Sequence, residues 1–258
     1  MQRLPLLIDR VLGEGGIRAM LQPIYDIRGS APSPCGVECL SRGPRRSNAE
    51  SAAVLFDYVR RKKREADVDR ACISAALSAS ARLHADTRVG LNVHATTLAR
   101  DEGFAAWLLA HLALCDIAPS RVVLEIIEHG PAQDLESLGD CLKLLRADGV
   151  RLALDDVGLG NSGLRMVVEW APEFIKIDRF FVSGASECPR KRAVIDSVVS
   201  LSAGIGAITV AEGVETPEQL QLVIDAGVRL AQGWVLCKAL PVDELAAAVP
   251  QLFPPGRT

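Results

Sequence analysis

Short apolar runs rich in β-branched residues alternate with longer helical patterns along almost the whole chain. This alternation is typical of βα units and not of a β-sandwich. We expect strands at 19–25, 36–40, 89–93, 122–127, 152–155, 174–178, 208–212 and 230–235. Helical patterns lie between most of them, for example at 67–83, 132–147, 190–203 and 216–226. The pattern predicts an α/β fold, an eight-stranded βα barrel of the TIM type.

The connection between the first two predicted strands departs from this scheme. About ten residues join them, through Gly-Ser-Ala-Pro-Ser-Pro at 29–34. A helical crossover needs more residues, so this connection is expected to form a hairpin. We therefore predict a modified (β/α)8 barrel with one antiparallel strand near the start. The length of 258 residues suits a single domain, 1–258.

Composition and charge exclude several classes of protein. Hydrophobic residues make up 49% of the chain and charged residues 24%, as in globular proteins. Arg3, Asp9 and Arg10 interrupt the N-terminal segment, which therefore does not resemble a secretory signal, and nothing reads as a bilayer span. A cytoplasmic location and no membrane partner are expected. The net charge of −3 gives no general attraction to long nucleic acid, and the basic run 60–64 is interpreted as a solvated helix face.

The cysteines and histidines do not form a recognisable metal or disulfide pattern. Seven cysteines, an odd number without CxxC or CxxxH spacing, argue against a disulfide framework and against a zinc site. We interpret them as small, reduced core residues, with a reactive pair at Cys35 and Cys39 as the alternative. The four histidines have no i,i+4 spacing and are interpreted as structural or surface residues.

Polar residues interrupt seven of the predicted strands, within or at the end of each apolar run. They are Glu38, Asn92, Glu125, Asp155 with Asp156, Lys176, Glu212 and Gln232. Each alone has an ordinary structural explanation. Together they indicate a site, because the carboxyl ends of parallel barrel strands meet at one mouth and separate burial of so many charges would cost too much free energy.

Oxygen donors of this kind suit a hard cation. Asp, Glu and Asn without cysteine or histidine favour Mg²⁺ or Mn²⁺ over Zn²⁺ or copper. The adjacent Asp155 and Asp156 would raise each other's pKa unless positive charge lay between them. A carboxylate that bridges two metals about 3.5–4 Å apart is used for in-line displacement at phosphorus. Lys176 lies within an apolar strand, where it could hold a hydroxide or a phosphate near the metals.

These residues occur in motifs that resemble the EAL-domain family of cyclic di-GMP phosphodiesterases. In order, the motifs are Gln22-Pro-Ile24, Glu38-Cys-Leu-Ser-Arg42, Asn92 in Leu-Asn-Val-His, Glu125-Ile-Ile-Glu128, Asp155-Asp-Val-Gly, Lys176-Ile-Asp178, Glu212-Gly-Val-Glu215 and Gln232-Gly-Trp. The resemblance covers about residues 15–245, with similar gaps between motifs. It implies a modified βα barrel that uses Mg²⁺ or Mn²⁺ to hydrolyse cyclic di-GMP to linear 5′-pGpG.

The resemblance also implies a role for each residue. The implied first-metal ligands are Glu38, Asn92, Glu125 and Asp155, and the implied second-metal ligands are Asp155, Asp156 and Glu212. Glu38, Lys176 and Glu212 are the implied catalytic residues: Lys176 orients the attacking water and Glu212 binds or deprotonates it. Substrate contacts are expected from Gln22, Leu40, Arg42, Asp178 and Gln232, of which Arg42 contacts the phosphate. Glu128 is expected to brace the loop after the paired aspartates, and Glu215 to support the site.

Some positions depart from the family pattern. Cys39 replaces the alanine of the motif that names the family, Ile127 replaces a threonine, and 157–163 lacks the usual Phe and Tyr side chains. In the family this loop links the second metal to the dimer interface, so a homodimer is expected and its packing or the rate could be altered. Because every metal ligand is retained, an active enzyme is favoured.

Three alternatives remain open at this point. The chain could be a catalytically weak or inactive cyclic di-GMP receptor that signals through the loop after Asp156. It could be an enolase-type barrel, in which strand carboxylates bind Mg²⁺ and a lysine abstracts a proton. It could also serve only in protein interaction. No sensory or cyclase domain is recognisable, so control is expected through dimerisation, a separate regulatory protein or the expression level.

Overall fold

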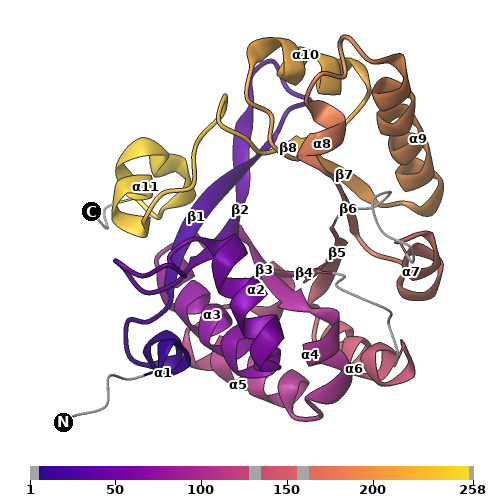
Figure 1. Ribbon diagram of the computed structural model, residues 1–258. Coiled ribbons are helices and arrows are strands. Elements are labelled where there is room, and N and C mark those ends of the chain that lie inside the picture. The colour runs from indigo at the N-terminus through magenta and orange to yellow at the C-terminus, as the bar shows by residue number, and fades with distance from the viewer. Residues whose placement is uncertain (1–5, 128–134, 156–162, 256–258) are drawn as a thin grey trace.

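The strands close into a barrel in which neighbours in the sequence are neighbours in space (Figure 1). The computed structural model describes residues 6–127, 135–155 and 163–255. The strands are β1 (Arg18–Asp26), β2 (Ser33–Arg42), β3 (Arg88–His94), β4 (Val122–Ile127), β5 (Arg151–Leu154), β6 (Phe174–Ile177), β7 (Ile208–Ala211) and β8 (Leu230–Ala231). The predicted TIM-type barrel is confirmed.

One strand runs against the others, as the short first connection predicts. β1 pairs antiparallel with both of its neighbours, β2 and β8, whereas every other neighbouring pair is parallel. The predicted hairpin between β1 and β2 is confirmed. Its register places Gln22 opposite Glu38, so that the polar residue of β1 faces the site residue of β2.

The last strand is shorter than the sequence pattern indicates. We predicted a strand over 230–235, but β8 ends at Ala231. Gly233 explains the difference, because a Cβ atom at this position would lie only 2.1 Å from the carbonyl oxygen of Val214. The chain therefore passes directly against another backbone segment, a close approach that only glycine permits, and leaves the sheet there.

Helices surround most of the barrel, and several cover the position that the sequence predicts. They are α1 (Leu7–Leu12), α2 (Ala52–Lys62), α3 (Glu65–Ser80), α4 (Ala95–Arg100), α5 (Phe104–Leu114), α6 (Leu135–Ala147), α7 (Gly163–Trp170), α8 (Arg179–Val182), α9 (Pro189–Ile205), α10 (Pro217–Asp225) and α11 (Val242–Ala248). Thr216 caps the start of α10, since its Oγ1 accepts a hydrogen bond from the backbone of Gln219 at 3.2 Å. The first residues of the predicted helix 132–147 lie outside the described residues.

Side chains alternate between the inside and the outside of the barrel with the period of two that a strand imposes. In β4, Leu124 and Ile126 belong to the main core beneath the helices, whereas Val123 belongs to a separate apolar group inside the barrel. That inner group also contains Ala153, Phe174, Val210 and Leu230. Each of these five residues lies two positions before a polar residue singled out in the sequence. The inner group thus forms an apolar floor beneath the candidate site.

The cysteines only partly match their interpretation as core residues. All seven are free thiols, but only Cys39 and Cys72 are buried, and the other five are partly exposed. Burial raises the pKa of the Cys39 thiol to about 12, which argues against the alternative of a reactive pair with Cys35. Among the described residues, every helix is too short or too polar to cross a bilayer.

Candidate active site

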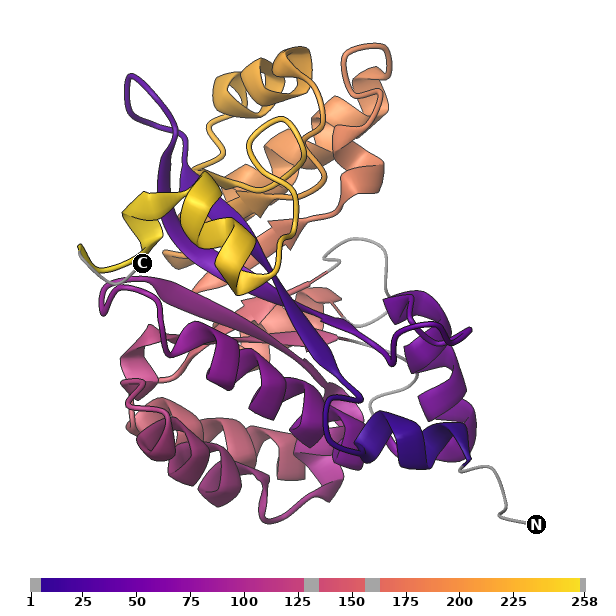
Figure 2. The same cartoon turned by 90° about the vertical axis from the view of Figure 1, so that its left-hand side faces the viewer.

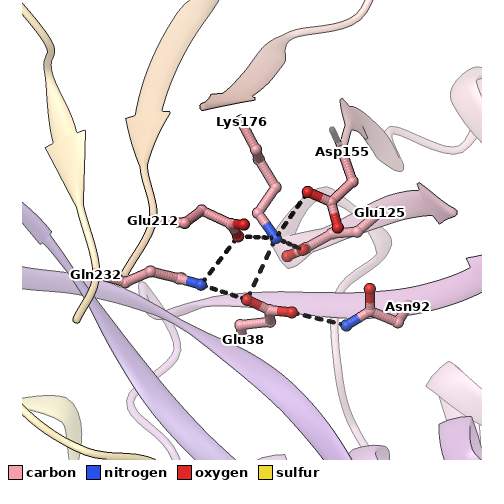
Figure 3. Close-up of polar contacts among 7 residues, drawn as sticks. All are labelled: Glu38, Asn92, Glu125, Asp155, Lys176, Glu212 and Gln232. Carbon is pink, nitrogen blue, oxygen red and sulfur yellow. Dashed lines mark hydrogen bonds and ion pairs between the residues drawn. The ribbon is translucent and has the colours of Figure 1, made fainter. Parts of the chain in front are cut away.

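Seven polar side chains from seven strands or strand ends point toward one another inside the barrel (Figure 3). They are Glu38, Asn92, Glu125, Asp155, Lys176, Glu212 and Gln232. The strand period explains this meeting, because each of the last five lies one step beyond the apolar floor on the same inner face. The predicted convergence of these residues is therefore seen directly.

The ammonium group of Lys176 lies at the centre of this group. Its Nζ is 2.5 Å from a carboxylate oxygen of Glu212, 3.2 Å from Glu38 and 3.9 Å from Asp155, and it also bonds to Glu125. Lys176 is only 1% exposed. One buried positive charge is thus shared by four carboxylates, which leaves the centre with a surplus of acidic groups.

Two amides complete the contacts of Glu38. Asn92 Nδ2 donates to Glu38 Oε1 at 2.8 Å, and Gln232 Nε2 donates to Glu38 Oε2 at 2.5 Å and to Glu212 Oε1 at 3.1 Å. Both oxygens of Glu38 are therefore engaged. Gln232 Oε1, in contrast, is buried and has no hydrogen-bond partner within the described residues, so it is an acceptor that a water, a substrate or a cation could satisfy.

The pKa values differ within the group because the charges are shared unequally. Burial and the negative charge of Glu38 raise the pKa of Glu125 to about 8, against the attraction of Lys176. Burial also raises the pKa of Glu212, and the charge of Asp155 adds to this effect. For Glu38, Lys176 and the two amides outweigh burial and lower the pKa. The carboxyl groups of this site therefore differ in their affinity for protons, and that of Glu38 is the lowest of these three.

The residues present fit a hard divalent cation by their chemistry. Carboxylate and amide oxygens dominate the group, as Mg²⁺ and Mn²⁺ prefer, and the acidic surplus would be offset by added positive charge. Within the described ranges, no group of three or more Asp, Glu, His or Cys side chains is already arranged to coordinate a metal ion. The carboxylates instead point at Lys176, which holds the compensating charge in this arrangement.

The other predicted site residues lie around this centre or apart from it. Leu40 and Arg42 line a cavity of about 160 Å³ together with Glu38 and Asn92. Gln22 donates to the carbonyl of Cys237 at 3.3 Å, on the β1 side of the barrel.

Two further predicted residues make contacts outside the central group. Asp178 caps α8 by accepting from the backbone of Phe180 at 2.7 Å, and Glu215 pairs with Arg179 at 3.2 Å. Asp156 and Glu128 lie outside the described residues.

Sequence reasoning missed a second buried cluster beside the site. Asp69 on α3 is 2% exposed, and its Oδ1 lies 2.8 Å from His94 Nδ1. Its Oδ2 accepts from Thr97 Oγ1 at 2.6 Å and from the backbone of His94 at 3.0 Å. Asp69 lies on the apolar face of its helix, next to Val68 and Cys72. A carboxylate on an apolar face could have indicated a buried polar cluster from the sequence.

Sequence reasoning also missed a glycine that makes room for a site carboxylate. A Cβ atom on Gly90 would lie 2.0 Å from Glu125 Oε1. No feature of the sequence pairs these two residues, because the contact depends on the β3–β4 register and on the rotamer of Glu125.

Known proteins resemble this chain in sequence and in fold. It is 38% identical over 165 residues to the cyclic di-GMP phosphodiesterase RocR of Pseudomonas aeruginosa, a match that covers 62% of this chain and 41% of RocR. The chain thus matches less than half the length of that relative. The EAL enzyme Bd1971, in a form with cAMP and cyclic di-GMP bound, has the same fold, with a TM-score of 0.84 at 21% identity over 94% of this chain and 67% of Bd1971.

A third comparison concerns a protein seen with a metal and a nucleotide. The Klebsiella pneumoniae protein BlrP1, in its complex with manganese and cyclic di-GMP, is similar with a TM-score of 0.74 and 26% identity. The match covers 85% of this chain and 55% of BlrP1. Residues 8–239 match the EAL domain, and the chain therefore belongs to the EAL domain family.

Proposed function

We propose that this chain hydrolyses one phosphodiester bond of cyclic di-GMP to give linear 5′-pGpG, with Mg²⁺ or Mn²⁺ as cofactor. The observation that carries the proposal is the convergence of four carboxylates, a lysine and two amides on one point inside an EAL-family barrel (Figure 3). The phosphodiesterase RocR and the manganese complex of BlrP1 support the choice of substrate and of metal.

The proposed metal ligands follow from the donor atoms in the site. Glu38, Asn92, Glu125 and Asp155 would hold one cation, and Asp155, Asp156 and Glu212 a second. When bound, the cations supply positive charge that offsets the negative charge of the phosphate and lowers the pKa of water. Binding of the cations would also release protons from the carboxyl groups and weaken their ion pairs with Lys176.

The chain's own residues account for the remaining parts of the reaction. Lys176 donates a hydrogen bond that orients the attacking water, and Glu212, whose carboxylate lies 2.5 Å from Lys176 Nζ, accepts its proton. The water oxygen attacks phosphorus in line, the bond from phosphorus to the 3′-oxygen breaks, the leaving oxygen takes up a proton from solvent, and Glu212 releases its proton to solvent. Arg42 lies in the adjoining cavity, where its guanidinium could contact the phosphate.

Incubation with cyclic di-GMP and Mn²⁺, followed by chromatography of the nucleotides, tests this proposal. An enzyme gives pGpG. Binding of cyclic di-GMP without product identifies the alternative, a receptor that signals through the loop after Asp156. The absence of both binding and product overturns the assignment to cyclic di-GMP. Membership of the EAL family already argues against the enolase-type alternative.

We also propose that the chain, as one EAL-type domain, works as a homodimer. On α7, Leu164 is 67% exposed and Val168 is 82% exposed, one helical turn apart. This exposed apolar pair supports an interface with a second copy. Sedimentation of the wild type and of Val168→Glu checks the proposal, and equal molecular weights for both at a monomer's value would contradict it. A separate regulatory protein and a cytoplasmic location stay predictions.

A further inference from the structure

The basic run 60–64 lies beside the opening of the barrel, outside the candidate active site. It forms the end of α2 and the connection to α3, and we call it the basic end of α2. Figures 1 and 2 show α2 at the end of the barrel to which β3 and β4 point. Arg60 lines a surface cavity together with His94 and Ile127, the last residues of these two strands. A ligand that approaches the strand cluster from this side therefore passes the basic end of α2.

Positive charge exceeds negative charge at this end of the helix. The segment 57–67 contains five basic residues and three acidic ones, Asp57, Glu65 and Asp67. The three arginines pair with Asp57 or with Asp67. Lys62 and Lys63 are exposed and form no ion pair within the described residues; the Lys62 ammonium lies only 5.7 Å from the centroid of the Tyr58 ring. The uncompensated charge thus belongs to these two lysines.

Helix stability explains part of this charge, but not the charge of Lys63. Basic residues in the last turn of a helix interact favourably with its dipole, which accounts for Arg60, Arg61 and Lys62. Lys63 follows as the C-cap, with a left-handed backbone at φ 53° and ψ 45°. Glycine adopts this conformation with less strain than lysine does. The end of the helix would therefore be more stable with glycine, and its stability does not account for the lysine.

The proposed substrate is an anion that the rest of the protein does not attract. Cyclic di-GMP carries one negative charge on each of its phosphodiester groups. The chain has a net charge of −3, and in the strand cluster four carboxylates share one ammonium. A region of positive charge beside such an opening raises the local concentration of an anion and the rate of encounter. Solvated lysines can act in this way without touching the bound ligand.

We propose that the basic end of α2 is an electrostatic guide for cyclic di-GMP, and that Lys62 and Lys63 supply its uncompensated charge. The guide acts before the ligand reaches the strand cluster, so it raises kcat/KM and leaves kcat unchanged. Its action is screened by salt, because the Debye length falls from about 10 Å at 0.1 M to about 3 Å at 1 M ionic strength. This inference rests on the proposed function.

The experiment measures kcat and KM for cyclic di-GMP with Mn²⁺ and the full chain, at about 0.02 M and about 0.5 M NaCl. The double variant Lys62→Gln/Lys63→Gln should lower kcat/KM by about three- to tenfold at low salt, with kcat unchanged. At high salt it should lie within about twofold of the wild type, because screening removes the effect of the guide. For a protein that binds without cleaving, the association rate constant measured by stopped-flow fluorescence takes the place of kcat/KM.

The matched control removes the same amount of charge from the other end of the barrel. Arg28 lies in the β1–β2 hairpin and Arg82 lies between α3 and β3, both at the end where the parallel strands begin. Figure 2 shows this hairpin and α2 at opposite ends of the barrel. Arg28→Gln/Arg82→Gln has the same net charge as the double lysine variant. It should keep kcat/KM within about twofold of the wild type at both salt concentrations.

Lys63→Gly separates the charge of this residue from its part in the fold. Because glycine relieves the left-handed backbone, the melting temperature should rise by about 1–3 °C. The loss of one charge should nevertheless lower kcat/KM at low salt by about two- to threefold. A purely structural role for Lys63 predicts no such loss in a protein that is more stable than the wild type.

The outcomes separate this inference from the proposed function. If the wild type neither binds nor cleaves cyclic di-GMP at either salt concentration, the proposed function fails, and the guide fails with it. If the wild type acts on cyclic di-GMP but Lys62→Gln/Lys63→Gln keeps the wild-type kcat/KM at low salt, only the guide is overturned. An equal loss at both salt concentrations also overturns it, as does an equal loss in the Arg28→Gln/Arg82→Gln control.

Discussion

Two buried charged clusters lie next to each other in this molecule, and they are balanced in opposite ways. The strand cluster consists of Glu38, Glu125, Asp155, Lys176 and Glu212, and its one ammonium serves four carboxylates. The helix cluster consists of Asp69, His94 and Thr97, and its donors satisfy both oxygens of its one carboxylate.

The difference shows which cluster needs something from outside the chain. In the helix cluster the donors and acceptors bond to one another. They fix the turn from β3 into α4, two residues beyond Asn92. The strand cluster keeps an acidic surplus and a raised pKa on Glu125, and the neighbouring Gln232 has an oxygen without a hydrogen-bond partner within the described residues. A folded chain tolerates such an imbalance mainly where a ligand completes it.

The largest expected effect comes from Glu38 in the strand cluster. Glu38→Gln keeps the shape of the side chain but removes the charge proposed to hold a metal, so turnover of cyclic di-GMP should fall by about 10³-fold or more. The barrel should remain folded, since three carboxylates still contact Lys176. Steady-state rates and circular dichroism measure both outcomes.

A surface substitution provides the control for Glu38→Gln. Glu169→Gln removes a carboxylate that pairs with Arg165 at 2.7 Å on α7, and it should leave the rate within about twofold. Wild-type turnover in a folded Glu38→Gln protein would reject the assignment of the site.

Removal of Lys176 tests the charge balance of the strand cluster directly. Lys176→Met keeps most of the side-chain volume but leaves four carboxylates without their shared cation. The free energy of unfolding near neutral pH in EDTA should fall by about 3–5 kcal/mol, as for other buried pairs that lose one partner. Urea denaturation measures this loss, and Lys143→Met, which removes an exposed lysine paired with Asp140, should cost less than about 1 kcal/mol.

Manganese should then act on the Lys176→Met protein as a replacement cation. If the carboxylates bind metal, a concentration of about 100 times Kd should restore roughly 2.7 kcal/mol of stability. The same addition should have no effect on a variant that also carries Glu38→Gln and Glu125→Gln. Equal stability with and without manganese in Lys176→Met would argue against metal binding by these carboxylates.

The helix cluster should show a smaller loss that depends on pH. Asp69→Asn leaves the buried His94 and Thr97 donors poorly satisfied and should cost about 2–3 kcal/mol. Although burial alone would lower it, the hydrogen bond and charge of Asp69 raise the pKa of His94 above 6.5. The stability from this pair is therefore fully present below pH 6.5 and is lost as the pH rises through the folded pKa.

The pH dependence distinguishes this cluster from a neutral hydrogen bond. The difference in unfolding free energy between the wild type and Asp69→Asn should be larger at about pH 6 than at about pH 9. Urea denaturation at the two pH values measures it. A difference that is constant with pH would show that His94 does not gain a proton in the fold.

The two clusters also show which parts of the site could be predicted from the sequence. The strand cluster was predictable because a polar residue in an apolar strand is conspicuous, and barrel geometry brings strand ends together. The helix cluster was not, because Asp69 and His94 are 25 residues apart and their contact depends on how α3 packs against β3. The predicted end of β8 was wrong for a similar reason, because the contact between Gly233 and Val214 joins residues that are far apart in the sequence.

The smallest expected effect concerns Gly90. This residue belongs to the strand site, but, like the helix cluster, its role becomes visible only in the packed barrel. Gly90→Ala would place a methyl group 2.0 Å from Glu125 Oε1 and 3.3 Å from the backbone oxygen of Val37. The Glu125 carboxylate must turn away from Lys176, so stability should fall by about 1–2 kcal/mol and turnover by roughly tenfold. Gly204→Ala, on α9 where nothing lies within 4 Å, should instead be neutral or slightly stabilising. Wild-type turnover in Gly90→Ala would mean that the reaction does not need Glu125 in its present position. The strand cluster would then not depend on the exact placement of this carboxylate.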